Sequence, residues 1–397
     1  MKYNFDELTE RRGTGCVKWD EKPPCSVDVG SDDVIPLWVA DMDFAVAPAI
    51  QEAIRLRAQH PIFGYTHVED DYYEAVISWF QRRHHWKIER EWMLYTIGVV
   101  PAMSVCIKAL TMPGEKVLIL SPDYNCFFSS IKNNGCEVVE SILRQNCSTQ
   151  NRFEMDWESF EALCADEKTT VFLLCNPHNP TGRVWSREEL QRMADICHRY
   201  QVTIVSDEIH GELIMPGQQF CPMGTVDTDA IILNSPSKSF NIAGLQVANI
   251  ICKDAAIRRR IDRAININEV CDINPFAPVA LKAAYNDSEE WIDALNQYIW
   301  DNYQALCDFV AHHMPLWKVM PLEGTYLAWV DVSAACQVNG DTVAAYCDRI
   351  LREAKVWLNP GTMYGPLSGE GYLRINIACP RSLLTEALER IKNTIRQ

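Results

Sequence analysis

The chain has 397 residues and a formal net charge of −16, and its length suggests two packed domains around more than one small core. The acidic balance argues against a nucleic-acid or anionic-membrane partner, because phosphate groups are bound by a basic face. Hydrophobic residues make up 48% of the chain and charged residues 23%, which is ordinary for a soluble globular protein.

The amino-terminal stretch MKYNFDELTE is polar and lacks the apolar segment of a secretory signal peptide. No stretch approaches the roughly 20 apolar residues of a membrane span. Sixteen scattered cysteines without paired CxxC motifs indicate reduced thiols in a cytoplasmic protein. The adjacent pairs His84-His85 and His312-His313 lie on helical stretches where neighbours point apart, so we expect surface residues and no metal site.

The first 49 residues read as an irregular arm that contributes to a smaller domain. The glycines of RRGTGCVKW, Gly13 and Gly15, lack the third glycine and the preceding strand of a dinucleotide-binding motif, which disfavours a nicotinamide dehydrogenase. The stretch LWVADMDF, with Trp38, Asp41 and Asp43, leaves two interpretations open. It either borders the substrate or packs against a partner subunit.

Four continuous apolar runs dominate the middle of the chain, at residues 116–120, 170–174, 202–205 and 230–233. Unbroken apolar runs favour parallel strands that are covered on both faces. Between the second and third runs, SREELQRMADICHRY predicts a helix, because Ser186 and Glu189 form a capping box ahead of an apolar stripe. The β-α-β-α order predicts an α/β large domain over residues 50–288 with a mostly parallel central sheet.

From residue 289 the pattern changes to that of a smaller α+β domain over residues 289–397. A long amphipathic helix is expected over 291–313, followed by strands near 326–330 and 372–377. A closing helix follows, with four apolar side chains on one face: Leu384, Leu388, Ile391 and Ile395.

Polar side chains follow each of the four predicted strands: Tyr124 in SPDY, Asn179 in CNPHNPTG, Asp207 and His210 in SDEIH, and Lys238 in NSPSK. In open parallel sheets, ligands bind beyond the carboxyl ends of the strands, so these side chains should face one crevice. A lysine near a carboxylate suits pyridoxal phosphate, which needs an amine for its Schiff base and an acid for its pyridine nitrogen.

This ordered set of motifs resembles that of the fold-type I pyridoxal-phosphate enzymes, the class I/II aminotransferase superfamily, over nearly the whole chain. The resemblance implies that Lys238 carries the cofactor and moves the substrate's Cα proton, and that Asp207 pairs with the pyridinium nitrogen. It also implies that Asn179 bonds the ring hydroxyl and that Tyr124 stacks on the ring. His210 stands where most relatives have a tyrosine on the same oxygen, or it simply fills that space.

For the cofactor phosphate, the stretch IGVVPAMSV offers the backbone N–H groups of Gly98, Val99 and Val100 at the start of a helix. Ser235 and Ser237, which follow the last strand, add two hydroxyl groups. Tyr65 in FGYTH resembles the tyrosine that reaches the phosphate from a second subunit, which implies a homodimer with shared sites. Many relatives place a phosphate-binding arginine eight residues past the lysine. Here that residue is Gln246, so we expect weaker cofactor retention.

Arg374 in GYLRINIACPR resembles the arginine that binds the substrate's α-carboxylate. Alternation supports this role, since Leu373 and Ile375 take one face of a strand and leave Arg374 on the other. A guanidinium also matches a carboxylate with two parallel hydrogen bonds. Plainer interpretations remain open: an Asx turn for Asn179, a salt bridge for Arg374, and half-buried aromatic packing for Tyr65 and Tyr124.

Three stretches, DEIH, NPHNPTGRVW and LWVADMDF, resemble the carbon–sulfur β-lyase subfamily, which includes cystathionine β-lyase and cysteine-S-conjugate β-lyase of the MalY/PatB type. The implied reaction is α,β-elimination of L-cystathionine or a related cysteine S-conjugate to a thiol, pyruvate and ammonia. Two alternatives stay open: an aminotransferase of aromatic or sulfur amino acids, and a regulatory or binding protein that retains the cofactor pocket.

Overall fold

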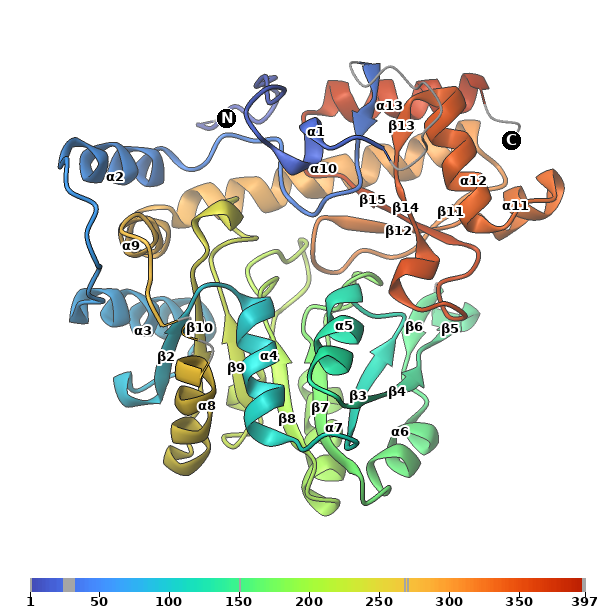
Figure 1. Ribbon diagram of the computed structural model, residues 1–397. Coiled ribbons are helices and arrows are strands. Elements are labelled where there is room, and N and C mark those ends of the chain that lie inside the picture. Colours follow the sequence, from blue (N-terminus) through green and yellow to red (C-terminus); the bar gives the residue numbers. More distant parts are fainter. Residues whose placement is uncertain (1, 24–32, 150, 268, 270, 395–397) are drawn as a thin grey trace.

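The computed structural model describes residues 2–23, 33–149, 151–267, 269 and 271–394 (Figure 1). One half is built on a seven-stranded sheet whose spatial order is β2-β10-β9-β8-β7-β3-β4. Its strands are β2 (Met93–Thr96), β10 (Ala248–Ile251), β9 (Ile231–Asn234), β8 (Thr203–Asp207), β7 (Thr169–Cys175), β3 (Lys116–Ser121) and β4 (Glu137–Ile142). Strand β10 runs antiparallel to both of its neighbours, and the other neighbouring pairs are parallel. The predicted mostly parallel sheet is confirmed.

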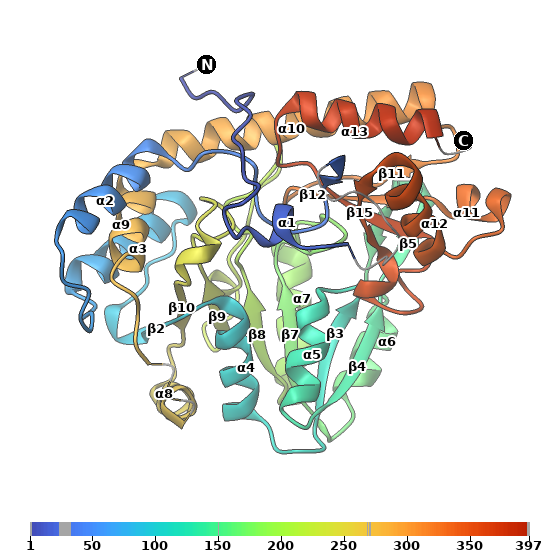
Figure 2. The same ribbon diagram turned by 45° about the horizontal axis from the view of Figure 1, so that its top comes forward.

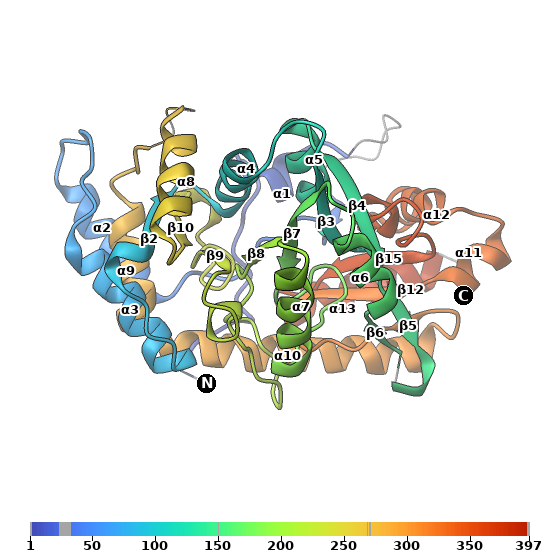
Figure 3. The same ribbon diagram turned by 90° about the horizontal axis from the view of Figure 1, so that it is seen from below.

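The sheet is covered on both faces, which explains the unbroken apolar runs. Along β3, Leu118 and Leu120 join one hydrophobic cluster while Val117 and Ile119 join another on the opposite face. Helices α4 (Val99–Leu110), α5 (Asn125–Asn133) and α8 (Ala255–Ile267) cover one face. Helix α7 (Arg187–Arg199) and the longer α10 (Glu289–His313) lie on the other side of the sheet (Figure 3). The capping box predicted for Ser186 and Glu189 is present at the start of α7.

The second half contains a four-stranded antiparallel sheet in the order β11-β12-β15-β14. Its strands are β11 (Lys318–Val319), β12 (Leu327–Asp331), β15 (Tyr372–Asn376) and β14 (Asn359–Pro360), and its helices are α11 (Ser333–Asn339), α12 (Val343–Arg349) and α13 (Arg381–Thr394). Leu384, Leu388 and Ile391 of α13 are buried as expected, while Ile395 lies outside the described residues. The predicted domain limits, 1–49, 50–288 and 289–397, stay a prediction.

The amino-terminal residues are tied to the carboxyl-terminal half by β1 (Ile35–Pro36), which pairs in parallel with β13 (Val356–Trp357). The remaining elements are helices α1 (Val17–Asp20), α2 (Pro48–Gln59), α3 (Asp70–His84), α6 (Trp157–Cys164) and α9 (Ala277–Asp287), and the hairpin strands β5 (Arg144–Asn146) and β6 (Arg152–Glu154). Single 3₁₀ turns occur at Arg90–Trp92, Cys147–Thr149, Met223–Thr225, Ala243–Leu245 and Gly361–Tyr364, and a π-helical turn, Ile350–Ala354, follows α12.

Two expectations about side chains have different outcomes. His85, His312 and His313 are exposed, but the expectation for His84 is wrong. The His84 side chain is 7% exposed, because the last turn of α3 packs against a buried carboxylate and Nε2 lies 2.7 Å from Glu212 Oε1. Among the helices formed by the described residues, none is both long and apolar enough to traverse a bilayer.

Candidate active site

The residues predicted at the strand ends meet at one edge of the seven-stranded sheet. Asp207 ends β8, Asn179 follows β7, Tyr124 follows β3, and Lys238 follows β9. Figure 1 shows this edge facing the four-stranded sheet, from which Arg374 on β15 reaches across to Asn179. The two halves of the chain therefore both contribute to the crevice.

The amine of Lys238 is the central basic group of this crevice. Nζ donates a hydrogen bond of 2.5 Å to the backbone carbonyl of Ala40. Burial and, to a smaller extent, Arg374 lower the pKa of Lys238 to about 8, against the opposite effects of Asp41 and Asp207. Near neutral pH, a useful fraction of the amine is therefore unprotonated and able to act as a nucleophile or base.

Asp207 is a buried carboxyl group with few partners of its own. One of its oxygens accepts a hydrogen bond of 3.1 Å from Ile209 N. Burial raises the pKa of Asp207 to about 7, and Lys238 partly offsets this rise. Oε1 of the neighbouring Glu208 accepts hydrogen bonds from Met223 N at 2.7 Å and from Ser206 Oγ at 3.0 Å, which holds that side chain against the surrounding loops. Asp207, at the end of β8, is the carboxyl group that we expect beside a cationic partner such as a protonated ring nitrogen.

Arg374 is 4% exposed and is held from two sides. Nη1 donates to Asn179 Oδ1 at 3.2 Å, and Nη2 donates to the carbonyl of Trp38 at 2.9 Å. The guanidinium carbon lies 4.6 Å from the ring centre of Tyr364. Nε has no hydrogen-bond partner among the described residues. Since a guanidinium carries five N–H groups, this arrangement fixes its plane and leaves donors for a carboxylate.

His210 and Tyr124 complete the enclosed part of the crevice. The His210 ring is buried, stands edge-on to Tyr326, and has no partner for Nδ1 within the described part of the chain. Burial lowers the pKa of His210 to about 3, with smaller contributions from Lys238 and Arg374, so the ring is neutral. Burial also raises the pKa of Tyr124, which is close enough to Arg374 and Asp207 to interact with both.

The residues predicted for the phosphate group lie at the start of α4 and after β9. Gly98 precedes α4 with a φ of 148°, and the first turn of α4 carries no acidic side chain. Ser237 is partly exposed. The hydroxyl of Ser235 donates instead to Val247 O at 2.5 Å and accepts from Ser237 N at 3.0 Å. In this arrangement Ser235 stabilises the loop, and its hydrogen is not available to a ligand.

Tyr65 is not part of this crevice within a single chain. Its side chain is 96% exposed in the connection between α2 and α3, at the left edge of Figure 1. Gln246 is also exposed, and its φ of 52° places it in the left-handed region at the end of a 3₁₀ turn. The roles predicted for these two residues stay predictions.

The stretch LWVADMDF, residues 37–44, borders the crevice through its backbone. The carbonyl of Ala40 accepts hydrogen bonds from Lys238 and from the hydroxyl of Tyr326, the latter at 2.9 Å. The carbonyl of Trp38 accepts from Arg374 and from Asn359 Nδ2, at 2.9 Å each. The roles of Tyr326 and Asn359 were not predicted from the sequence. Their side chains donate to backbone carbonyls, and every residue has such a carbonyl, so the sequence does not indicate which one is contacted.

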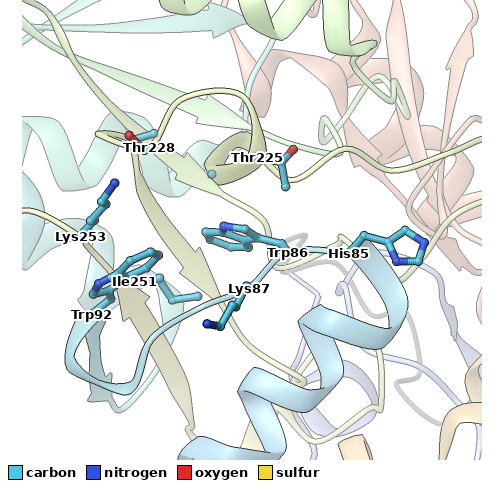
Figure 4. A pocket seen from close by; sticks show the side chains of 10 residues that line it. His85, Trp86, Lys87, Trp92, Thr225, Thr228, Ile251 and Lys253 are labelled. Carbon is cyan, nitrogen blue, oxygen red and sulfur yellow. The ribbon is translucent and has the colours of Figure 1, made fainter.

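A separate surface pocket of about 350 Å³ lies at the other end of the sheet, where Ile251 ends β10 and Ala230 precedes β9. Figure 4 shows the rings of Trp86 and Trp92 and the side chain of Lys253 around it. None of the predicted site residues lines this pocket, so it is distinct from the crevice that contains Lys238.

Comparison with known proteins agrees with the motifs and the geometry. The family model described as aminotransferase class I and II matches residues 32–391. The chain belongs to this family. Cystathionine beta-lyase PatB from Bacillus subtilis is 39% identical to this chain over 393 residues, which cover 98% of this chain and 99% of PatB.

Two solved structures closely resemble the structure of this chain. Cystalysin from Treponema denticola, described as containing a pyridoxal 5'-phosphate cofactor, has a TM-score of 0.93 at 33% identity and covers 99% of this chain and 98% of its own. The pyridoxal-phosphate-bound C-S lyase from Staphylococcus hominis has a TM-score of 0.89 at 33% identity and covers 98% of each chain. The predicted fold class, that of the fold-type I pyridoxal-phosphate enzymes, is confirmed.

Proposed function

We propose that this protein is a pyridoxal-phosphate-dependent carbon–sulfur β-lyase that cleaves L-cystathionine or a related cysteine S-conjugate to a thiol, pyruvate and ammonia. The observation that carries the proposal is the amine of Lys238 beside the buried carboxyl of Asp207, with the guanidinium of Arg374 across the same crevice. The names of PatB, at 39% identity, and of the C-S lyase, at 33%, support the choice of reaction.

The residues present fit pyridoxal phosphate. Lys238 would hold its aldehyde carbon, Asp207 its ring nitrogen, and Asn179 with His210 its ring oxygen, while the N–H groups of residues 98–100 and the Ser237 hydroxyl would face its phosphate. When bound, the cofactor supplies an electron sink for the negative charge that develops at the substrate's Cα. The unpartnered Nδ1 of the neutral His210 ring supports this assignment, because it leaves one buried polar atom without a protein partner.

The side chains of this protein then have distinct tasks. Arg374 binds the α-carboxylate and thereby fixes the direction of the Cα–H bond. Lys238 becomes a free amine once the substrate's amine has replaced it, and its pKa near 8 then leaves part of it neutral, so that it takes the Cα proton as a general base. A cation beside Asp207 favours its ionised form, which burial disfavours by raising the pKa of this carboxyl to about 7. The thiolate leaves with the electron pair of the Cβ–S bond, and one water is consumed in forming pyruvate and ammonia.

Aminotransferase activity is the second candidate, and the family description favours keeping it. Both reactions begin with removal of the Cα proton, so the same residues serve both. The test is to incubate the loaded protein with cystathionine in the absence of any 2-oxo acid. Many turnovers of thiol and pyruvate support the lyase, whereas product limited to one equivalent per site supports the aminotransferase.

We also propose a homodimer in which Tyr65 enters the site of the second copy. Leu56 near the end of α2 and three residues of the connection to α3, Ile62, Phe63 and Tyr65, are exposed apolar side chains, with exposures of 52%, 67%, 54% and 96%. Apolar patches of this kind support an interface with another chain. A reducing compartment such as the cytoplasm is part of the same proposal, and free buried thiols such as Cys106 and Cys175 support it.

A further inference from the structure

Residues 37–44, which we call the strap, carry two acidic side chains, Asp41 and Asp43. Both form ion pairs with the amino-terminal turn of residues 11–20. Lys18 is 1% exposed, and its Nζ lies 2.6 Å from Asp43 Oδ2 and 3.2 Å from the carbonyl of Asp41. Arg11 reaches Asp43 Oδ1 at 2.6 Å and Asp41 Oδ2 at 2.7 Å. Trp19 Nε1 donates to Asp43 Oδ1 at 2.7 Å.

The inner side of the strap touches the two side chains that act on the substrate. Ala40 O is the hydrogen-bond acceptor of Lys238, and Trp38 O is an acceptor of Arg374. These two residues come from different halves of the chain, so the strap is the element they have in common. Figure 2 shows α1, which carries Lys18, in front of the junction between the two sheets.

Both halves also grip the backbone of the strap through asparagine side chains. Asn241, three residues beyond Lys238, donates to Met42 O at 3.0 Å and Phe44 O at 2.9 Å. Asn376, two residues beyond Arg374, donates to Val39 O and Asp41 O at 2.6 Å each. The backbone of the strap is therefore held by two neutral amide side chains, and its acidic side chains are held by the charged groups of Arg11 and Lys18.

We propose that Lys18 and Asp43 are positioning residues for the reaction, because their buried ion pair holds the strap where Ala40 O and Trp38 O fix Lys238 and Arg374. Compared with an apolar pair of similar size, a buried ion pair adds little net stability, but it demands a defined geometry. A displaced strap would release the Arg374 guanidinium from Trp38 and the Lys238 amine from Ala40. The inference rests on the proposed function only for the choice of substrate.

The experiment compares Lys18→Met with a matched control, Lys116→Met. Lys116 Nζ pairs with Asp166 Oδ2 at 2.5 Å at the start of β3, at the opposite end of the sheet from Lys238. The first measurement is hydrogen exchange of the unloaded chain at three strap amides that are bonded in the structure, those of Leu37, Met42 and Asp43. The second is KM and kcat for cystathionine with the loaded enzyme.

In Lys18→Met we expect exchange at the three amides to rise at least about tenfold. We expect KM to rise by a similar factor with a smaller change in kcat, since tenfold is the lower end of the effect of one hydrogen bond to a charged group. Lys116→Met should change neither quantity. Asp43→Asn keeps the shape of the carboxyl and serves as the second variant if Lys18→Met does not fold.

Unchanged exchange in the folded variants overturns the proposal. Faster exchange with an unchanged KM overturns it too, since the pair would then stabilise the strap without positioning Arg374. The exchange comparison uses the unloaded chain, so it is decided even if the parent shows no lyase turnover. That last result would count against the proposed function alone.

Discussion

Replacing Arg374 by lysine tests the assignment of the substrate's carboxylate. The lysine keeps the positive charge but loses the two-pronged face of the guanidinium and its contact with the Tyr364 ring, whose centre lies 4.6 Å from the guanidinium carbon. It also loses the simultaneous bonds to Asn179 Oδ1 and Trp38 O, which hold the guanidinium plane. The carboxylate would then meet a single, poorly oriented donor.

The expected loss follows from the number of bonds that change. One hydrogen bond to a charged group contributes about 1.5–3 kcal/mol, and each 1.4 kcal/mol corresponds to about tenfold in rate. We therefore expect kcat/KM for cystathionine to fall roughly 10- to 150-fold in Arg374→Lys. Most of the fall should be in KM, because the carboxylate is bound in both the ground state and the transition state.

The assay is continuous release of thiol, a product that cystathionine and the control substrate both give. An S-conjugate of cysteamine lacks the α-carboxylate, so its slow turnover should be nearly equal in the parent and in Arg374→Lys. This double comparison isolates the interaction between the guanidinium and the carboxylate. A loss of the same size with both substrates, or a change of less than about threefold with cystathionine, would refute the assignment.

Three further predictions follow from Asp207, Gln246 and Tyr65. In the unloaded chain the raised pKa of Asp207, about 7, means that the folded state keeps a proton which the unfolded state loses near pH 4. Its contribution to stability therefore falls as the pH rises from about 4 to about 7. Over that range the free energy of unfolding of Asp207→Asn, measured with denaturant, should rise by roughly 3–5 kcal/mol relative to that of the parent. Gln246→Arg should slow cofactor loss after dilution, followed by the visible absorbance, and equal or faster loss contradicts the expected phosphate contact. A mixture of Tyr65→Ala and Lys238→Ala chains, each nearly inactive alone, should recover about a quarter of the parent activity if mixed dimers restore one complete site. No recovery in a proven mixed dimer speaks against shared sites.

The core of the large sheet could be predicted from the sequence because its strands are apolar on both faces. The predicted runs 116–120 and 170–174 lie inside β3 and β7. The runs 202–205 and 230–233 begin one residue before β8 and β9. The edge strand β4 was not predicted, since it is only partly buried and carries Glu137 and Glu140. Strand β10 was also missed, because its antiparallel pairing between β2 and β9 depends on contacts with distant segments.

Within the site, side chains with distinctive chemistry could be found at strand ends, whereas backbone groups could not. Lys238 and Asp207 were predicted because an amine and a carboxylate follow successive apolar strands. Arg374 lies inside β15 and was predicted from the alternation along that strand and from its resemblance to a family motif. The carbonyl of Ala40 is chemically the same as any other carbonyl, so its contact with Lys238 needed the fold. The burial of His84 similarly depends on Glu212, far away in the sequence.

The pairing of β1 with β13 has a consequence for how the molecule is made. Ile35 and Pro36 leave the ribosome early, but their partners Val356 and Trp357 are synthesised more than three hundred residues later. All seven strands of the large sheet are complete once Ile251 has emerged, so that half can begin to form on a nascent chain. The strap, which follows β1, cannot take its final position until translation is nearly finished. A polypeptide released before residue 356 could form the large sheet that carries Lys238 and Asp207, but it could not close the crevice with the strap.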